Sequence, residues 1–370
     1  MNNNPLKQLG QLGQSIWLDY IKRDLFKGQL KKLIAEDGLK GMTSNPDIFE
    51  KAITESHDYD GAIHQLIEKG HDVTQIYNIL TEQDIRSAAD IFRPVFDNTH
   101  GLDGFVSIEV NPKLAYHTQQ TIEAARQLWQ EVSRPNIFVK VPATKEGLPA
   151  ITQLISEGIN VNITLLFGLN RYQEVVGAYL TGIEERLQKG KPIDHISSVA
   201  SFFLSRIDSL IDPLLEKIIA KQNNQSSLAK ALHGQIAIAS AKKAYVIFTQ
   251  IIQSDRFKAL LKHGVQPQRL LWASTSTKNP NYNDVKYVDD IIAQNTVNTV
   301  PMQTLNAYRD HGQPQIRINL EVDKAKWQLE QLSILGIDLD QLTQQLETEG
   351  IKKFIQAYDK LTATLTNMIR

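Results

Sequence analysis

The chain has 370 residues, of which 42% are hydrophobic and 22% are charged, and its formal net charge at pH 7 is −1. This length permits one large α/β domain or two ordinary domains. The near-zero charge excludes a global attraction to nucleic acid or to an anionic membrane surface, so an acidic substrate would have to meet a local cationic pocket. The absence of cysteine excludes disulfides, thiolate zinc sites and a cysteine nucleophile.

Targeting signals are not apparent in the sequence. The first residues, Met1 to Leu6, lack the charged segment and apolar run of a secretory signal. No stretch approaches the roughly 18 apolar residues of a membrane helix. We therefore expect a soluble, cytoplasmic protein with no membrane or nucleic-acid partner.

Strand-like and helix-like segments alternate along the chain. Helical spacing of apolar residues is clear in Thr118–Val132 and in Tyr172–Leu187. The expected strands are short and rich in β-branched residues: Ser15–Asp19, Leu39–Thr43, Phe105–Val110, Ile137–Val141, Val161–Leu165, His195–Ser201, Leu270–Ala273 and Thr296–Val300. Eight strands separated by helices predict a (β/α)₈ TIM-type barrel, with a doubly wound α/β sheet as the alternative.

The remaining segments extend this barrel without indicating a second domain. Two connections, Pro46–Asp103 and Arg206–Pro267, are too long for one helix and should hold extra helices. The segment Asn223–Ser227 is expected to be a polar loop. Residues 322–370 predict a helical C-terminal extension, broken at Gly336 and Gly350, that packs on a single barrel domain spanning residues 1–370. This extension could cover the barrel mouth or form an interface.

Two of the expected strands carry polar side chains on one face. Ser107 and Glu109 alternate with apolar residues, as do Asn162 and Thr164. Residues two apart in a strand share a face. In a barrel covered by helices that polar face would point inward, near the strand ends where barrel enzymes hold their chemistry. The alternative is an edge strand with one face in water.

Lys140 lies in the apolar run 136–143. A buried ammonium is unfavourable unless it is paired or neutralised, and desolvation favours the neutral amine that attacks a ketone to form a Schiff base. The alternatives are a lysine that extends to solvent, or one that protects an edge strand from aggregation.

Several motifs, in chain order, resemble those of the transaldolase family. Phe138 to Thr144 resembles its Schiff-base lysine strand. The other matching segments are Trp17 to Asp19, Gly41 to Pro46, Val106 to Val110, Asn160 to Phe167 and Ser201 to Arg206. The resemblance runs from about Ser15 to about Pro301, and Trp272–Pro280 resembles a longer bacterial subgroup. It implies transfer of a dihydroxyacetone unit from a ketose phosphate to an aldose phosphate, as in the pentose phosphate pathway.

The resemblance also implies a role for each matching residue. Lys140 would form the Schiff base, Asp19 would move the C4 hydroxyl proton, and Glu109 and Thr164 would hold a proton-shuttling water. The implied substrate-binding residues are Thr43, Asn45, Asn162 and Ser201, and the implied phosphate-binding residues are Arg206, Ser274 and Lys278. Phe203, two residues after Ser201, is expected to follow the strand end and to contact the substrate near the barrel mouth. Lys278 stands in for the second arginine that many transaldolases have after the serine. A lysine binds phosphate as a point charge.

Each of these residues has a structural alternative. Asp19 could cap a helix, Asn45 before Pro46 could be a turn residue, Arg206 could be a solvated helix residue, and Phe203 could belong to the core. The nine histidines show no metal-ligand spacing and no nucleotide motif is present, so we expect neither metal nor cofactor. The rival functions are an aldolase that releases free dihydroxyacetone and a non-catalytic barrel scaffold. The oligomeric state remains open.

Overall fold

The computed structural model describes residues 4–369, and within them eight parallel strands close into a barrel in sequence order. Strand β1 pairs with β8 from Gln14–Thr296 to Leu18–Val300, which completes the ring. The strands are β1 Gln14–Asp19, β2 Gly41–Thr43, β3 Phe105–Glu109, β4 Ile137–Pro142, β5 Val161–Leu166, β6 Ser198–Phe203, β7 Arg269–Ala273 and β8 Thr296–Val300. The predicted (β/α)₈ barrel is confirmed, and the doubly wound alternative is wrong.

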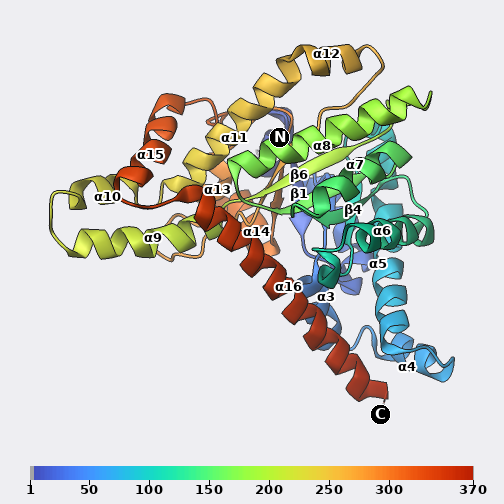
Figure 1. Ribbon diagram of the computed structural model, residues 1–370. Helices are drawn as coiled ribbons and strands as arrows, with labels where there is room; N and C mark the ends of the chain where they lie inside the picture. Colours follow the sequence, from blue (N-terminus) through green and yellow to red (C-terminus); the bar gives the residue numbers. More distant parts are fainter. Residues whose placement is uncertain (1–3, 370) are drawn as a thin grey trace.

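Helices surround this barrel and fill both long connections, as expected (Figure 1). The first connection holds α3 Pro46–Thr54, α4 Asp60–Glu68 and α5 Val73–Asn98; the second holds α9 Ser205–Ala220, α10 Ser226–Leu232, α11 Ile236–Gln253 and α12 Asp255–Leu261. The others are α1 Pro5–Gln11, η1 Leu25–Gln29, α2 Leu30–Asp37, η2 Pro112–Leu114, α6 Thr118–Val132, α7 Gly147–Glu157, α8 Leu169–Gln188, α13 Lys286–Asp289, α14 Met302–His311, α15 Val322–Ile334 and α16 Leu339–Ile369.

The sixth strand differs from its prediction. It begins at Ser198 rather than His195 and ends at Phe203 rather than Ser201. His195 lies in an exposed turn, where its Nδ1 is 3.1 Å from the Asp194 carboxylate. The backbone N–H of Ser197 donates to the Asn160 side chain over 2.9 Å, so a side chain satisfies it before the ladder begins. Phe203 is consequently the last strand residue and does not follow the strand end.

The predicted polar loop at 223–227 is too long by two residues, because Ser226 and Ser227 begin α10. Ser226 is buried rather than solvated. Its hydroxyl accepts from the Asn223 backbone N–H at 3.0 Å and donates to the Ile218 carbonyl at 3.2 Å. The polar stretch 223–227 therefore contains the start of a helix as well as a loop.

The C-terminal extension holds two helices, of which α16, the long dark-red helix, runs beside α3 (Figure 1). Gly336, with φ of 75°, separates α15 from α16 as expected. Gly350 does not break the extension, because it lies inside α16. A Cβ there would stand 2.9 Å from Leu165 Cδ2 and 3.5 Å from Arg206 Nη1. Glycine is needed here for close approach to the barrel rather than for a turn. Arg370 lies outside the described residues.

The barrel interior is layered along its axis. At the amino-terminal end of the strands, Arg269 forms a buried ion pair of 3.0 Å with Asp103, and Ser15 hydrogen-bonds to both. Above them the rings of Trp17, Phe105 and Phe138 stack, with centroids 4.3 Å apart for the two phenylalanines and 5.9 Å for Trp17 and Phe138. This packed base leaves the carboxyl ends of the strands for polar side chains. None of the described helices is long and apolar enough to cross a membrane.

Candidate active site

A cavity of about 700 Å³ opens at the carboxyl ends of the strands. Strand residues form its floor, and α3, the 274–278 segment and α16 form its walls. The residues from the sequence prediction that line it are Asp19, Thr43, Asn45, Lys140, Thr164, Ser201, Phe203, Arg206, Ser274 and Lys278. Glu109 and Asn162 lie directly behind this lining, in contact with Lys140 and Ser201 respectively.

Lys140 is buried on β4 and points to the neighbouring strands. Its Nζ lies 3.0 Å from Glu109 Oε2 and donates to the Ser44 carbonyl at 2.9 Å. Only 5% of the Lys140 side chain and 3% of the Glu109 side chain are exposed. Pairing therefore makes burial of this lysine tolerable. Burial raises the pKa of Glu109 despite the opposing charge of Lys140, which makes this carboxylate a better proton acceptor.

A hydrogen-bonded row crosses the floor from β6 to β3. The Ser201 hydroxyl donates to Asn162 Oδ1 at 2.6 Å, and the Asn162 amide donates to Ser107 Oγ at 3.1 Å. The row fixes which end of the Asn162 amide faces each neighbour. Thr164 Oγ1, by contrast, is fully buried without a hydrogen-bond partner among the described protein atoms. Buried hydroxyls normally have partners, so Thr164 Oγ1 is suited to hold a water or a substrate oxygen.

Asp19 ends β1 and faces the same cavity. Burial raises the pKa of its carboxyl, and the positive charges of Lys140, Lys278 and Arg206 oppose this. Asp19 does not cap the next helical segment, whose N-cap is Asp24. A carboxyl of raised pKa, set among cations, can both accept and return a proton.

Arg206 and Lys278 bring two cations to one wall. Arg206 lies in the first turn of α9, with its guanidinium 5.3 Å from the ring centroid of Phe203. Lys278 lies at the cavity rim. Partial desolvation lowers its pKa, and the charge of Arg206 lowers it further to a smaller extent. Ser274 stands between the two segments, with its hydroxyl 2.9 Å from that of Ser205. Two cations that repel each other favour an anion between them.

Asn45 is the N-cap of α3, because its Oδ1 accepts from the Ile48 backbone N–H at 2.9 Å. The side chain of Asn45 therefore has a structural role, but as a helix cap in extended conformation rather than as the turn residue that the sequence offered as an alternative. Asn45 still lines the cavity, and so does Thr43 at the end of β2. Helix capping and contact with a ligand are compatible for this side chain.

The sequence matches the description "Transaldolase/Fructose-6-phosphate aldolase" over residues 16–365. The chain belongs to this family. It is similar to the transaldolase of Trichodesmium erythraeum, with 47% identity covering 100% of this chain and 99% of the relative. The Frankia alni transaldolase is 43% identical over 99% and 98% of the two chains, and the Mycobacterium bovis transaldolase is 44% identical over 97% and 95%. The family match extends beyond Pro301 and includes most of α16.

The sequence prediction left open whether the C-terminal extension covers the barrel mouth, and it missed the residues of α16 that line the cavity. Lys353, Phe354, Gln356, Ala357 and Lys360 of this helix line it. Phe354 is buried, and its ring centroid lies 6.0 Å from the Lys140 ammonium. Helical periodicity in this segment indicated an amphipathic helix but not where it packs.

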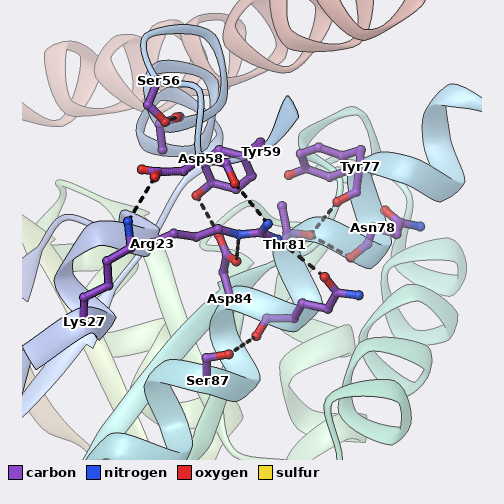
Figure 2. A network of polar contacts seen from close by, with 12 residues as sticks. Arg23, Lys27, Ser56, Asp58, Tyr59, Tyr77, Asn78, Thr81, Asp84 and Ser87 are labelled. Carbon is purple, nitrogen blue, oxygen red and sulfur yellow. Dashed lines mark hydrogen bonds and ion pairs between the residues drawn. The ribbon is translucent and has the colours of Figure 1, made fainter. Parts of the chain in front are cut away.

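A second missed feature is the polar network behind the loop that follows Asp19. Arg23 donates to Asp84 of α5 at 2.8 Å, and the Tyr59 hydroxyl donates to the other Asp84 oxygen at 2.6 Å. Figure 2 shows these side chains together with Lys27 and Asp58. The Arg23 guanidinium also lies 4.4 Å from the ring centroid of Tyr59. The network fastens the segment after β1 to the first long connection.

Metal-binding groups are not gathered in the site. Among residues 4–369, no cluster of three or more His, Cys, Asp or Glu side chains is placed to hold a metal ion. The ionisable groups at the cavity floor are Lys140 beside Glu109 and the carboxyl of Asp19, and further charged side chains line its walls.

Proposed function

We propose that this protein is a transaldolase, which moves a dihydroxyacetone unit from a ketose phosphate to an aldose phosphate through a Schiff base on Lys140. The observation that carries the proposal is the buried amine of Lys140, 3.0 Å from the Glu109 carboxylate at the floor of a 700 Å³ cavity rimmed by cations. The overall reaction would convert sedoheptulose 7-phosphate and glyceraldehyde 3-phosphate into erythrose 4-phosphate and fructose 6-phosphate. The metabolic setting would be the pentose phosphate pathway.

The first step needs Lys140 as a neutral amine. Its proton passes to Glu109, whose raised pKa and close contact favour this acceptance. The amine then attacks the C2 carbonyl of the ketose, and the carbonyl oxygen leaves as water after protonation. The product is an iminium ion on Lys140.

Proton transfer during dehydration is assigned to Glu109 and Thr164. Both side chains have buried oxygens without a hydrogen-bonding partner of good geometry among the described protein atoms. A water molecule bound between them would satisfy these groups and carry the proton between Glu109 and the leaving oxygen. Asn162, oriented by Ser107 and Ser201, is suited to hydrogen-bond the dihydroxyacetone unit.

Carbon–carbon cleavage is assigned to Asp19. It removes the proton of the C4 hydroxyl, the C3–C4 bond breaks, and the bonding electrons move into the iminium to give an enamine. The aldose phosphate formed from C4 onward leaves, an acceptor aldose phosphate enters, and the same steps run in reverse. Because the iminium accepts the electron pair, the chemistry requires no organic cofactor or metal.

The far end of the substrate carries a phosphate group, for which Arg206, Ser274 and Lys278 are suited. Arginine can bind two phosphate oxygens through its planar fork, whereas lysine contributes a point charge. The two cations converge at one wall of the cavity. This arrangement supports phosphorylated sugars as the substrates of a protein whose net charge is only −1.

Trapping tests the central assignment. Sodium borohydride should reduce the Schiff base formed with dihydroxyacetone, and peptide mapping should place the label on Lys140. The variant Lys140→Met should lose both the label and the activity. A label on another lysine would contradict the assignment, and a total lack of label and turnover would favour a non-catalytic barrel.

A simple aldolase that releases free dihydroxyacetone is the second candidate, because the matching family contains both activities. Product analysis with fructose 6-phosphate as donor separates the two. A transaldolase should form product mainly when erythrose 4-phosphate is present, whereas an aldolase should release dihydroxyacetone without it. The names of the relatives support the transferase.

The cellular setting follows from this function. We propose a cytoplasmic enzyme whose partners are small sugar phosphates, with no nucleic-acid or membrane partner. We also propose that residues 1–370 work as one barrel domain with residues 322–370 packed on it, because α16 supplies part of the cavity wall.

A further inference from the structure

An irregular segment, residues 274–285, joins β7 to α13 and forms part of the cavity wall. This segment carries Ser274 and Lys278 of the proposed phosphate site. Many of its side chains are exposed, including Lys278, Pro280 and Asn281. A segment with little apolar burial has low local stability, so its position depends on its polar anchors.

The first anchor joins the start of the segment to the start of α9. The Ser205 backbone N–H donates to the Ser274 carbonyl at 3.0 Å, and the two hydroxyls are 2.9 Å apart. Arg206 is the next residue of α9. The first anchor therefore places Ser274 against the helix turn that carries the arginine.

The second anchor lies at the other end of the segment. The Tyr282 hydroxyl donates to Asp212 Oδ2 at 2.6 Å, while the other Asp212 oxygen accepts from the Gly234 backbone N–H at 2.8 Å. Asp212 lies on α9, and only 5% of it is exposed. A Cβ on Gly234 would stand 2.6 Å from the Tyr282 hydroxyl, so the tyrosine fits closely against this backbone.

Lys278 lies midway between these anchors. It lines both the main cavity and a smaller one of about 210 Å³ whose walls include Asp212 and Tyr282. Its own side chain makes one short contact, a hydrogen bond of 2.6 Å to the Ser276 hydroxyl within the same segment. Its place near Arg206 therefore depends on the anchors of the segment, which also include the 2.9 Å hydrogen bond from the Thr275 hydroxyl to the Thr299 carbonyl.

We infer that Tyr282, held by Asp212, is a positioning residue for the phosphate group of the substrate. Tyr282 fixes the C-terminal part of the 274–285 segment to α9, the helix that carries Arg206, and so keeps Lys278 close to that arginine. The inference rests on the proposed function, since it takes Arg206 and Lys278 as phosphate ligands. Tyr282 itself does not line the main cavity.

The variant Tyr282→Phe tests this role because it removes one hydroxyl and keeps the ring. Borohydride trapping on Lys140 is measured as a function of concentration for two ligands, fructose 6-phosphate and dihydroxyacetone. The half-saturating concentration of fructose 6-phosphate should rise about three- to tenfold, which corresponds to about 0.7–1.4 kcal/mol and lies within the range for one ordinary hydrogen bond. That of dihydroxyacetone, which has no phosphate, should not change.

Tyr179→Phe is the matched control. Its hydroxyl also makes a 2.6 Å hydrogen bond, but to the Gln266 carbonyl, and neither residue lines the main cavity. This variant should leave both half-saturating concentrations unchanged. An unchanged value for fructose 6-phosphate in Tyr282→Phe, or an equal rise for both ligands, would overturn the inference while leaving the proposed function intact. If dihydroxyacetone fails to label Lys140 in the unmodified protein, the proposed function fails and the inference fails with it.

Discussion

The buried pair of Lys140 and Glu109 predicts a pH-dependent loss of stability in the variant Lys140→Met. The change removes the cation and leaves a carboxylate of which only 3% is exposed. Breaking a buried ion pair in this way costs about 3–5 kcal/mol of unfolding free energy. A double variant, Lys140→Met with Glu109→Gln, also removes the carboxylate that would remain unpaired. It should recover most of the lost unfolding free energy.

The sign of the pH dependence follows from the Glu109 carboxyl. Its pKa is raised by burial in the folded state and lies near about 4.3 in the unfolded chain. Below that value both states are protonated and the penalty is absent. Between that value and the folded pKa, Glu109 is ionised in the unfolded chain but still protonated in the folded protein. The unfolding free energy of Lys140→Met therefore falls as the pH rises, and it levels off above the folded pKa of Glu109.

Equilibrium urea unfolding, followed by tryptophan fluorescence, measures this effect. At about pH 8 the single variant should unfold at a lower urea concentration than the double variant, and the two curves should converge as the pH falls to about 4. Both variants should be catalytically inactive, which separates the stability of the pair from its chemistry. Identical unfolding of the two variants at about pH 8 would refute the reasoning, because Glu109 would then not be a buried, unpaired charge after loss of the lysine.

Two further predictions concern other charged groups. Arg206→Ala should raise KM for fructose 6-phosphate by a factor corresponding to about 1.5–3 kcal/mol and leave dihydroxyacetone binding unchanged, and Lys278→Ala should have a smaller effect of the same kind. Steady-state kinetics measures both variants, and equal effects on the two ligands would exclude a phosphate role. Burial, and then the charge of Glu131, raises the pKa of Glu82 to about 7 from 4.5. Glu82→Gln should therefore stabilise the protein by about 1–3 kcal/mol at about pH 8, and this gain should vanish as the pH falls through 4.5, as urea unfolding can measure.

Residues on the strands were predictable from the sequence because their placement is a local property. The period of two puts Glu109 on the face of Ser107, and Thr164 on the face of Asn162, whatever surrounds the strands. Closing the ring then brings β3, β4 and β5 side by side, and Glu109 meets Lys140. Local alternation and the parallel order of strands were sufficient for the cavity floor.

The cavity walls were not predictable in the same way. Phe354 approaches Lys140 only because α16 returns across the barrel mouth, and helical periodicity does not state which neighbour a helix meets. Gly350 was taken as a helix break from its residue type, whereas its role depends on the distance to Leu165. The Arg269–Asp103 pair, likewise, joins residues that are far apart in sequence. These features depend on tertiary packing, which no local pattern encodes.

We expect the choice between transfer and release of the dihydroxyacetone unit to depend on Phe203. This residue is buried, with 8% exposed, yet it lines the cavity that holds Lys140, and its ring centroid is 5.2 Å from that of Phe167. After cleavage the enamine on Lys140 reacts with whichever arrives first, a proton or an acceptor aldehyde, and a phenyl ring supplies no proton and excludes water.

Phe203→Tyr adds one hydroxyl to this wall at nearly constant volume, so it should orient a proton donor near the enamine carbon. We expect the release of free dihydroxyacetone to increase relative to transfer, measured as the ratio of the two rates with fructose 6-phosphate as donor and erythrose 4-phosphate as acceptor. Phe202→Tyr is the control, because the Phe202 ring packs against Tyr172 and Trp272 and does not line the cavity. An unchanged ratio in a folded, active Phe203→Tyr variant would show that the ring does not face the enamine. The Schiff-base role of Lys140 would stand, since it depends on the amine and its carboxylate rather than on the wall above them.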